Sequence, residues 1–507
     1  MLSLVKSAAV LGIDAYVVDV EADLALGLPQ LNTVGLPDAA VKESKERVRA
    51  AIKNSGFDFP SRRITVNLAP ADIKKEGSAF DLPMAVAILA ASNLIPRQKL
   101  DRYMLVGELS LDGRLKPVRG VLPMAVAARD KGFAAVLVPD ANAAEAAVVD
   151  GIDIIPLLSL SQAVSFLRGE ADISPRLVDR QAIFKAHKHY DLDFFDVRGQ
   201  SHAKRALEVA SAGGHNLIMM GPPGSGKTML AQRIVTILPE MSFEEAIETT
   251  KIHSVAGKMD GKALVAVRPF RAPHHTISDA GLIGGGTIPN PGEVSLAHNG
   301  VLFMDEMPEF KKNALEVLRQ PLEDGRVTIS RALMSITYPS RFMLVAAMNP
   351  CPCGYLGDQN KPCTCGPLEI RRYRSRISGP LMDRIDIHIE VPALKYKELT
   401  ERPSESSEAV RERVNRARLV QYERFTGRSY YFNARMPNRD LERFAVLSEE
   451  CGRFLEKVMQ TLKLSARAYS RIIKVSRTIA DLAGEPSITT KHLAEAVQYR
   501  SLDREAR

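Results

Sequence analysis

The chain has 507 residues, of which 45% are hydrophobic and 25% are charged, the ordinary mix of globular proteins. At about 150 residues per domain, this length predicts about three domains and excludes collagen, a wholly disordered chain and a small disulfide-stapled scaffold. The net charge of +8 fits a nucleic-acid-binding protein and a basic enzyme equally well.

The N-terminus and the hydropathy pattern bear on location. No stretch approaches the 18 uncharged apolar residues that would predict a membrane span. Asp14 interrupts the apolar N-terminus, and no small-residue cleavage site follows, which argues against a signal peptide. We therefore expect a cytoplasmic protein that does not contact a membrane.

The first predicted domain covers residues 1–170. Short apolar strands alternate with Ala-rich helices, which is typical of an α/β or α+β domain. The expected strands are 15–25, 62–72, 104–109 and 134–140, and the expected helices are 38–56, 81–95 and 124–132. A polar, charge-rich stretch then predicts a linker over 171–194.

The second predicted domain covers 195–394 and is α/β. Three strongly apolar runs, NLIMMG (216–221), GVLFMDE (300–306) and FMLVAAMN (342–349), are expected to be strands of a parallel sheet covered by helices on both faces. From 395 to 507 the chain is charged and lacks strand-like runs, which predicts an all-α lid.

A phosphate-binding loop follows the first of these strands. The run GPPGSGKT fits G-x-x-x-x-G-K-T between a buried strand and an amphipathic helix, the setting that this motif requires. Its backbone N–H groups can face phosphate oxygens, Lys227 can reach the β- and γ-phosphates, and the Thr228 hydroxyl can bind Mg²⁺. The predicted ATP-contacting residues are Gly221, Pro222, Pro223, Gly224, Ser225, Gly226, Lys227, Thr228 and Met229.

Polar residues end the other two strands. Asp305 and Glu306 follow the second strand, where Asp305 would hold Mg²⁺ through water and Glu306 would deprotonate the attacking water. Both can act only if the strand ends there, because neighbouring side chains of a strand point to opposite faces. Asn349 follows the third strand and would position water or sense the γ-phosphate.

Five motifs, in chain order, carry a family resemblance: GPPGSGKT, VLFMDE, AAMNPCPCGY, LMDRIDIH and LSARAYSRI. They resemble the magnesium-chelatase-like AAA+ ATPases, and within these the competence-associated ComM/YifB helicase group. The resemblance covers nearly the whole chain and implies a nucleotide-dependent homo-hexamer. It places an arginine finger for the neighbouring subunit's site at Arg384, with Arg376 as the rival, and a second sensor at Arg467.

The resemblance also implies an activity. It implies an ATP-dependent hexameric DNA motor or helicase that promotes branch migration of recombination intermediates in natural transformation, with single-stranded or branched DNA as partner. The alternative is a chelatase-type or protein-remodelling ATPase that acts on a protein partner. Every ATPase residue is common to both, so only the substrate separates them.

Two insertions set this ATPase apart from a plain P-loop protein. The first runs from about 253 to 298 and contains His274-His275, which we interpret as part of a structural loop because no third metal ligand follows at regular spacing. The second, 324–338, alternates about Arg331 and predicts a β-hairpin. Arg331, supported by Arg326, is either a contact to the DNA backbone or a solvated hairpin charge.

Four of the five cysteines cluster in the sequence as two C-x-C pairs: Cys351, Cys353, Cys363 and Cys365. Four thiolates suit tetrahedral Zn²⁺, although the spacing is tighter than the usual two-residue gap. Bound zinc and unliganded thiols both remain open.

The N-terminal domain has a second resemblance, carried by the stretches 74–84 and 107–120. They are similar to the proteolytic domain of Lon, an α+β domain of the S5 domain 2-like fold. Aligned without gaps, the nucleophile position falls on Ala79 and the lysine position on Leu122, and neither side chain can do acyl chemistry. We therefore expect a repurposed domain that is not an active protease.

Overall fold

The computed structural model describes residues 1–71, 75, 77–179, 182–183, 190–286, 289–331, 335–358, 361–394, 405–500 and 502. Lys74 and Glu76 of the Lon-like stretch, part of the predicted linker and the start of the predicted lid lie outside these ranges. The chain divides into two compact units: 1–186 with 243–266, and 187–242 with 267–507. None of the described helices combines the length and the apolar character needed to cross a membrane.

The first unit is built on a mixed seven-stranded sheet of order β3-β4-β2-β1-β5-β8-β9. Its strands are β1 (Leu2–Leu11), β2 (Asp14–Ala25), β3 (Gln30–Val34), β4 (Arg63–Ala69), β5 (Tyr103–Leu105), β8 (Ala135–Pro139) and β9 (Asp153–Leu157). β1 pairs antiparallel with β2 and parallel with β5. A short hairpin, β6 (Glu108–Leu109) with β7 (Leu115–Lys116), lies outside the main sheet.

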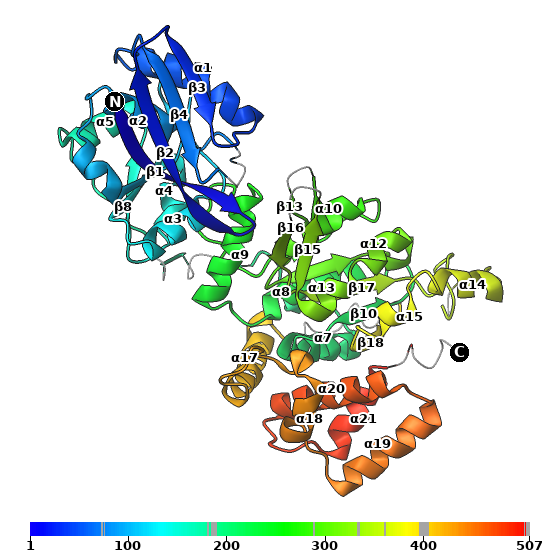
Figure 1. The fold of residues 1–507 in the computed structure, drawn as a ribbon. Helices are drawn as coiled ribbons and strands as arrows, with labels where there is room; N and C mark the ends of the chain where they lie inside the picture. The colour runs from blue at the N-terminus through cyan, green and yellow to red at the C-terminus, as the bar shows by residue number, and fades with distance from the viewer. Residues whose placement is uncertain are drawn as a thin grey trace. The chain divides into compact units, whose positions relative to one another are not determined.

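Helices pack on this sheet. They are α1 (Ala39–Asn54), α2 (Asp81–Ala91), α3 (Val121–Asp130), α4 (Asp140–Ala146) and α5 (Leu160–Arg168) (Figure 1). α2 is buried along its whole length and contacts β1 and β2, which explains why its sequence is apolar on all sides. The predicted alternation of strands and helices is confirmed for this region.

A helix from a distant part of the sequence completes the first unit. α9 (Phe243–Val255) packs against α3. Its Lys251 forms an ion pair with Asp14 at 2.8 Å, and Ser254 donates to the buried carboxylate of Glu145. Burial raises the pKa of Glu145, against the hydrogen bonds from Ser254 and the Leu122 N–H. The start of the predicted 253–298 insert therefore belongs to this unit.

The second unit is built on a parallel five-stranded sheet of order β11-β14-β17-β10-β18. The strands are β10 (Leu217–Met220), β11 (Phe270–Arg271), β14 (Val301–Met304), β17 (Met343–Met348) and β18 (Ile387–Glu390). The three predicted strands are confirmed and lie side by side as β14-β17-β10. Every residue of these three is buried, as a parallel sheet between helices requires.

Several helices belong to this core. They are α7 (Ser201–Gly213), α8 (Lys227–Ile237), α10 (Asp279–Ile283), α11 (Glu293–Leu296), α12 (Lys312–Glu316), α13 (Arg319–Asp324), α14 (Pro367–Arg374) and α15 (Gly379–Met382). Small antiparallel pairs are β12 (Gly284–Gly285) with β13 (Asn290–Pro291), and β15 (Arg326–Ser330) with β16 (Ser335–Pro339). The second pair confirms the two strands of the predicted hairpin, and residues 332–334 between them lie outside the described residues.

The C-terminal part of the same unit is helical, as predicted (Figure 1). It contains α17 (Ser407–Arg424), α18 (Asn438–Phe444), α19 (Glu449–Leu462), α20 (Ala466–Ala483) and α21 (Thr490–Gln498). α17 and α20 both contact α7 of the core. This helical part is called the lid below.

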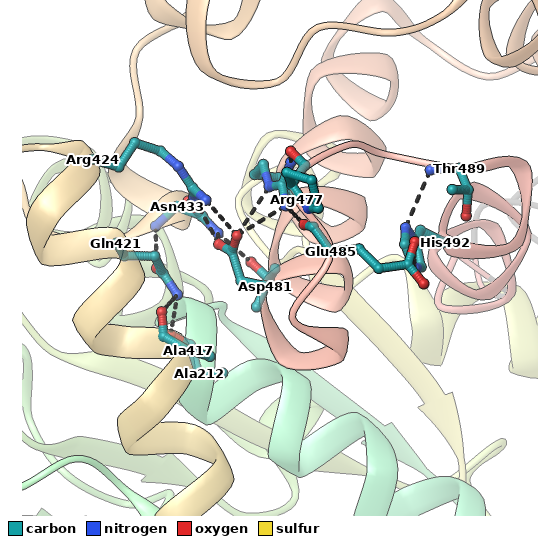
Figure 2. Close-up of polar contacts among 12 residues, drawn as sticks. Ala212, Ala417, Gln421, Arg424, Asn433, Arg477, Asp481, Glu485, Thr489 and His492 are labelled. Carbon is teal, nitrogen blue, oxygen red and sulfur yellow. Dashed lines mark hydrogen bonds and ion pairs between the residues drawn. The ribbon is translucent and has the colours of Figure 1, made fainter.

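A buried polar network joins the lid helices (Figure 2). Asp481 on α20 accepts from Arg424 on α17, from Arg477 Nε at 3.1 Å and from Asn433 Nδ2 at 2.8 Å. Gln421 bonds the carbonyl of Ala212 at 3.0 Å, which ties α17 to the C-terminal turn of α7. The position of α20 relative to the core is thus set by directed bonds as well as by apolar packing.

Candidate active site

The glycine-rich loop leaves the sheet at the carboxyl end of β10. Gly221 donates its N–H to Met348 O at 3.2 Å, and a Cβ at Gly221 would lie 2.1 Å from Val391 O. Gly224 and Gly226 have φ values of +77° and +86°, which L side chains rarely adopt. The sequence therefore uses glycine where the backbone must curl before α8.

Lys227 is the first residue of α8 and is buried. Its Nζ donates to the carbonyls of Gly221 and Pro222, both at 2.8 Å, and lies 3.4 Å from Asn349 Oδ1. Burial lowers the pKa of Lys227, against the carboxylates of Asp305 and Glu306. The ammonium group thus occupies the centre of the loop, where phosphate oxygens would replace the carbonyls as its partners.

Thr228 and Asp305 meet across the sheet edge. Thr228 Oγ1 donates to Asp305 Oδ2 at 2.7 Å, and Asp305 Oδ1 accepts from the N–H of Glu306 at 2.9 Å. A hydroxyl and a carboxylate oxygen are the ligands that Mg²⁺ accepts beside nucleotide phosphates. These two residues fit a magnesium site.

β14 ends at Met304, so Glu306 lies beyond the strand. Asp305 and Glu306 can therefore act at the same site, which adjacent side chains within a strand could not do. Its φ is +49°, an uncommon left-handed conformation that turns the chain away from the strand. The side chain is 55% exposed, and its Oε2 lies 3.8 Å from His275 Nδ1. His275, predicted to lie in a structural loop, is thus a neighbour of Glu306 that no residue pattern in the sequence indicates.

The two candidate arginine fingers both have carboxylate partners in their own chain. Arg384 pairs with Glu323 and donates to Pro380 O at 2.7 Å, and its side chain is 16% exposed. Arg376 pairs with Glu309 at 2.7 Å and is 52% exposed.

Arg467 lies in the first turn of α20 and pairs with Asp383 Oδ2 at 2.8 Å. Arg384 and Arg467 line one pocket of about 290 Å³. The structure therefore brings the predicted second sensor beside the predicted finger, through the adjacent residues Asp383 and Arg384.

One turn further along α20, an ion pair with a buried carboxylate joins the lid to the core. Arg471 Nη1 lies 2.8 Å from Asp386 Oδ1, and Asp386 also bonds His215 Nδ1 at 3.1 Å. Burial alone would raise the pKa of Asp386, but Arg471 and His215 hold it below its usual value. Burial and the charge of Arg471 lower the pKa of Lys474 to about 8.

The two predicted insertions contact each other. Tyr338 of β16 donates its hydroxyl to Pro289 O at 2.6 Å, and Arg331 donates Nε to Gly286 O at 3.3 Å. Val327 and Ile329 face inward, whereas Arg326 is exposed at the base of the hairpin. Between β11 and α11 the first insertion forms α10 and the small sheet β12-β13, so it is not one continuous loop.

The four clustered cysteines converge in space. Their Sγ atoms all lie within 4.8 Å of one another. Cys351 Sγ is 3.4 Å from Cys353 Sγ and 3.6 Å from Cys363 Sγ, distances much longer than the about 2.05 Å of a disulfide. A zinc tetrahedron with Zn–S bonds of about 2.3 Å has edges of about 3.8 Å, close to these separations. The cluster fits a tetrathiolate metal site.

The Lon-like positions of the first unit carry apolar side chains. Ala79 and Leu122 are both buried. Ser78, the hydroxyl nearest to the nucleophile position in sequence, donates to Glu108, and Asp81 pairs with Arg47 at 2.8 Å. Burial raises the pKa of Asp81 against the bonds from Arg47 and Ser44.

Comparisons with known proteins identify the family of the chain. Family models of magnesium chelatase match three stretches: subunit ChlI over residues 193–399 and 20–142, and the ChlI C-terminal region over 404–500. The chain is 47% identical to competence protein ComM of Haemophilus influenzae over 99% of this chain and 98% of the relative. It is 45% identical to the uncharacterized protein YifB of Escherichia coli, with the same coverage of 99% and 98%. Lon protease 2 of Bacillus subtilis is 31% identical over 150 residues, 28% of this chain and 27% of that protein.

Proposed function

The chain belongs to the ComM/YifB group of the magnesium chelatase ChlI family, and on this premise we propose that it is a hexameric ATP-driven motor that moves single-stranded or branched DNA. The family match indicates an ATPase of the AAA+ type. The observation that carries the proposal is the convergence of Lys227, Thr228, Asp305 and Asn349 at the carboxyl edge of one parallel sheet, beside Glu306.

The roles of the residues follow from their places. Lys227 would exchange its loop carbonyls for phosphate oxygens, and Thr228 and Asp305 would hold the metal. Bound ATP and Mg²⁺ supply the phosphoanhydride bond and the charge that its cleavage needs. Glu306 accepts the proton of the attacking water, and Asn349 orients that water.

A ring supplies the rest of the site. Arg384 of one protomer, with Arg376 as the alternative, enters the site of the next and neutralises charge on the γ-phosphate, an effect of about 10³–10⁵ in rate. Arg467 reports the nucleotide state to the lid. The proposed bound groups are therefore ATP and Mg²⁺, with Zn²⁺ at the four cysteines.

DNA is the proposed substrate for two reasons. One relative is named a competence protein, and competence is the uptake of DNA by a cell. The hairpin β15-β16 exposes Arg326 at its base and Arg331 at its far end, so hydrolysis could move cationic groups along a phosphate backbone. We propose branch migration during natural transformation as the physiological reaction. In this proposal the protein acts in the cytoplasm, and its first unit is not a protease.

The test compares ATP hydrolysis with and without a forked DNA, in the wild type and in Glu306→Gln. We expect DNA to stimulate the wild type and to be unwound, and the variant to bind ATP but lose turnover by about 10²-fold or more. Glu449→Gln, at a carboxylate that is 93% exposed in the lid, is the control and should behave as wild type. An absence of DNA stimulation would refute the motor.

The alternative is a chelatase-type or remodelling ATPase with a protein partner, which the magnesium chelatase models favour. It predicts hydrolysis that is indifferent to forked DNA. The same measurement therefore separates the two functions.

A further inference from the structure

The loop that holds the four cysteines lies between two parts of the ATP site. It begins directly after Asn349 and ends two residues before α14 (Pro367–Arg374), whose basic C-terminal end leads to Arg376. Residues 359–360 of the loop lie outside the described ranges, but all four cysteines are described. Any group that ties the cysteines together also fixes the distance between β17 and α14.

The first turn of this loop bears directly on the phosphate-binding loop. Gly354 donates its N–H to Cys351 O at 3.0 Å, which closes the turn. A Cβ at Gly354 would lie 2.6 Å from Cδ and 2.8 Å from Cγ of Pro223, and 3.9 Å from Cγ of Asn349. The turn and the second proline of GPPGSGKT are therefore in close packing contact.

At the other end of the loop, α14 contacts the backbone of Asn349 and Pro350. Arg374 of α14 donates Nε to Pro350 O at 3.1 Å. Tyr373 is buried, and burial raises its pKa to about 12. A hydrogen bond with the backbone of Asn349 opposes this rise. Asn349 and Pro350 are thus held from α14 on one side and lie beside Pro223 and Lys227 on the other.

The cysteines themselves have the features of a metal knuckle. Cys353 donates its N–H to Cys365 Sγ at 3.3 Å, and Cys365 donates its N–H to Cys363 Sγ at 3.4 Å. Backbone N–H groups directed at sulfur stabilise thiolates, the form in which cysteine binds a metal. Without a metal, thiolates this close together would repel each other, so most of the four sulfurs would keep their protons and the cysteines would not be tied together.

We infer that Zn²⁺ bound by the four cysteines is a brace for the ATP site: it ties Cys351 and Cys353 to Cys363 and Cys365 and so holds the Gly354 turn against Pro223 and Asn349 in the position that ATP binding requires. This inference rests on the proposed ATPase function and adds to it a metal that controls the ATP site from outside. The zinc takes no part in the chemistry of hydrolysis.

Two glycines of the loop provide a matched test. Gly354 and Gly357 have φ values of +85° and +78°, so alanine strains the backbone equally at both. At Gly357 a new Cβ meets no atom within 4 Å, whereas at Gly354 it meets Pro223. Relaxing that contact from 2.6 Å to the ordinary 3.4 Å moves the proline by about 0.8 Å, and a misplacement of about 1 Å can cost about 10²-fold in rate.

The experiment measures zinc per chain by elemental analysis, affinity for a fluorescent ATP analogue, and ATP turnover without DNA. We expect one zinc in the wild type, in Gly354→Ala and in Gly357→Ala, and none in Cys363→Ser/Cys365→Ser. ATP affinity or turnover should fall about tenfold or more in Gly354→Ala and in the cysteine variant, and stay unchanged in Gly357→Ala.

Each outcome has a separate meaning. Purified protein without zinc overturns the metal site, and equal ATP affinity and turnover in the two alanine variants overturn the brace. If the cysteine variant fails to fold, the two glycine variants still decide the question. Failure of DNA stimulation would refute the motor and leave the zinc content and ATP affinity as they are.

Discussion

The carboxylate of Asp481 is the group whose removal has the most clearly predicted effect on the stability of the lid. It is 1% exposed and serves two guanidinium groups, Arg424 at 13% and Arg477 at 3% exposure (Figure 2). Replacing it by Asn keeps the shape of the side chain but removes the charge. The new amide N–H₂ would also face the guanidinium groups of Arg424 and Arg477, which donate hydrogen bonds and cannot accept them.

The size of the loss follows from this burial. Removing one partner of a buried ion pair costs about 3–5 kcal/mol, because an uncompensated charge stays behind. With an m-value of about 3 kcal/mol/M in urea, Asp481→Asn should lower the unfolding midpoint of the second unit by about 1–1.7 M.

Far-UV circular dichroism in urea is the assay, since the chain has no Trp. The control is Arg453→Gln, which breaks an ion pair with side-chain exposures of 76% and 93% in the same lid and should shift the midpoint by less than about 0.3 M. If the two variants shifted the midpoint equally, the network would not be what fixes the lid.

Three further predictions concern other parts of the chain. Burial raises the pKa of Glu145, so its contribution to stability is complete below its unfolded pKa of 4.5 and is lost as pH rises through its folded pKa. At pH 8, Glu145→Gln should therefore unfold at a higher urea concentration than the wild type. Below pH 4.5 the two should unfold at the same urea concentration. Arg331→Ala should weaken DNA binding and reduce the slope of log affinity against log salt by about 1, with basal ATP turnover unchanged, and an unaltered slope would remove the assignment. Arg384→Ala should abolish ATP turnover. Mixing Arg384→Ala chains with Glu306→Gln chains should restore part of the turnover, because some interfaces of a mixed ring then combine an intact Glu306 with an intact Arg384. If mixing restores turnover to Arg376→Ala and Arg384→Ala keeps its activity, the finger is Arg376.

Much of the fold could be predicted from the sequence, because its central strands are apolar on both faces. β10, β14 and β17 are continuous apolar runs with turn residues at their ends, and this pattern identifies a covered parallel sheet. β1 was missed, since Ser3, Ser7, Ala8 and Ala9 give it little strand preference and only pairing with β2 makes it a strand. β11 was missed because two residues carry no periodicity.

The candidate site was predictable where chemistry depends on neighbours in sequence. The phosphate loop and the pair Asp305-Glu306 are local motifs, and Asn349 follows from sheet topology. The approach of His275 to Glu306 and of Pro223 to Gly354 depends on loops whose paths no pattern specifies. The assignment of α9 to the first unit was likewise invisible, because nothing in the sequence of its 13 residues shows against which unit the helix packs.

The place of α9 limits how this protein can be dissected. A shortened chain that starts near residue 190 keeps α9 but loses the surface that covers Thr250, Ile252 and Ser254. Such a fragment would expose side chains that the first unit buries, and poor behaviour on purification would say nothing about the ATPase itself. A clean excision must also replace 243–266 with a short tether, so that both crossings between the units are removed together.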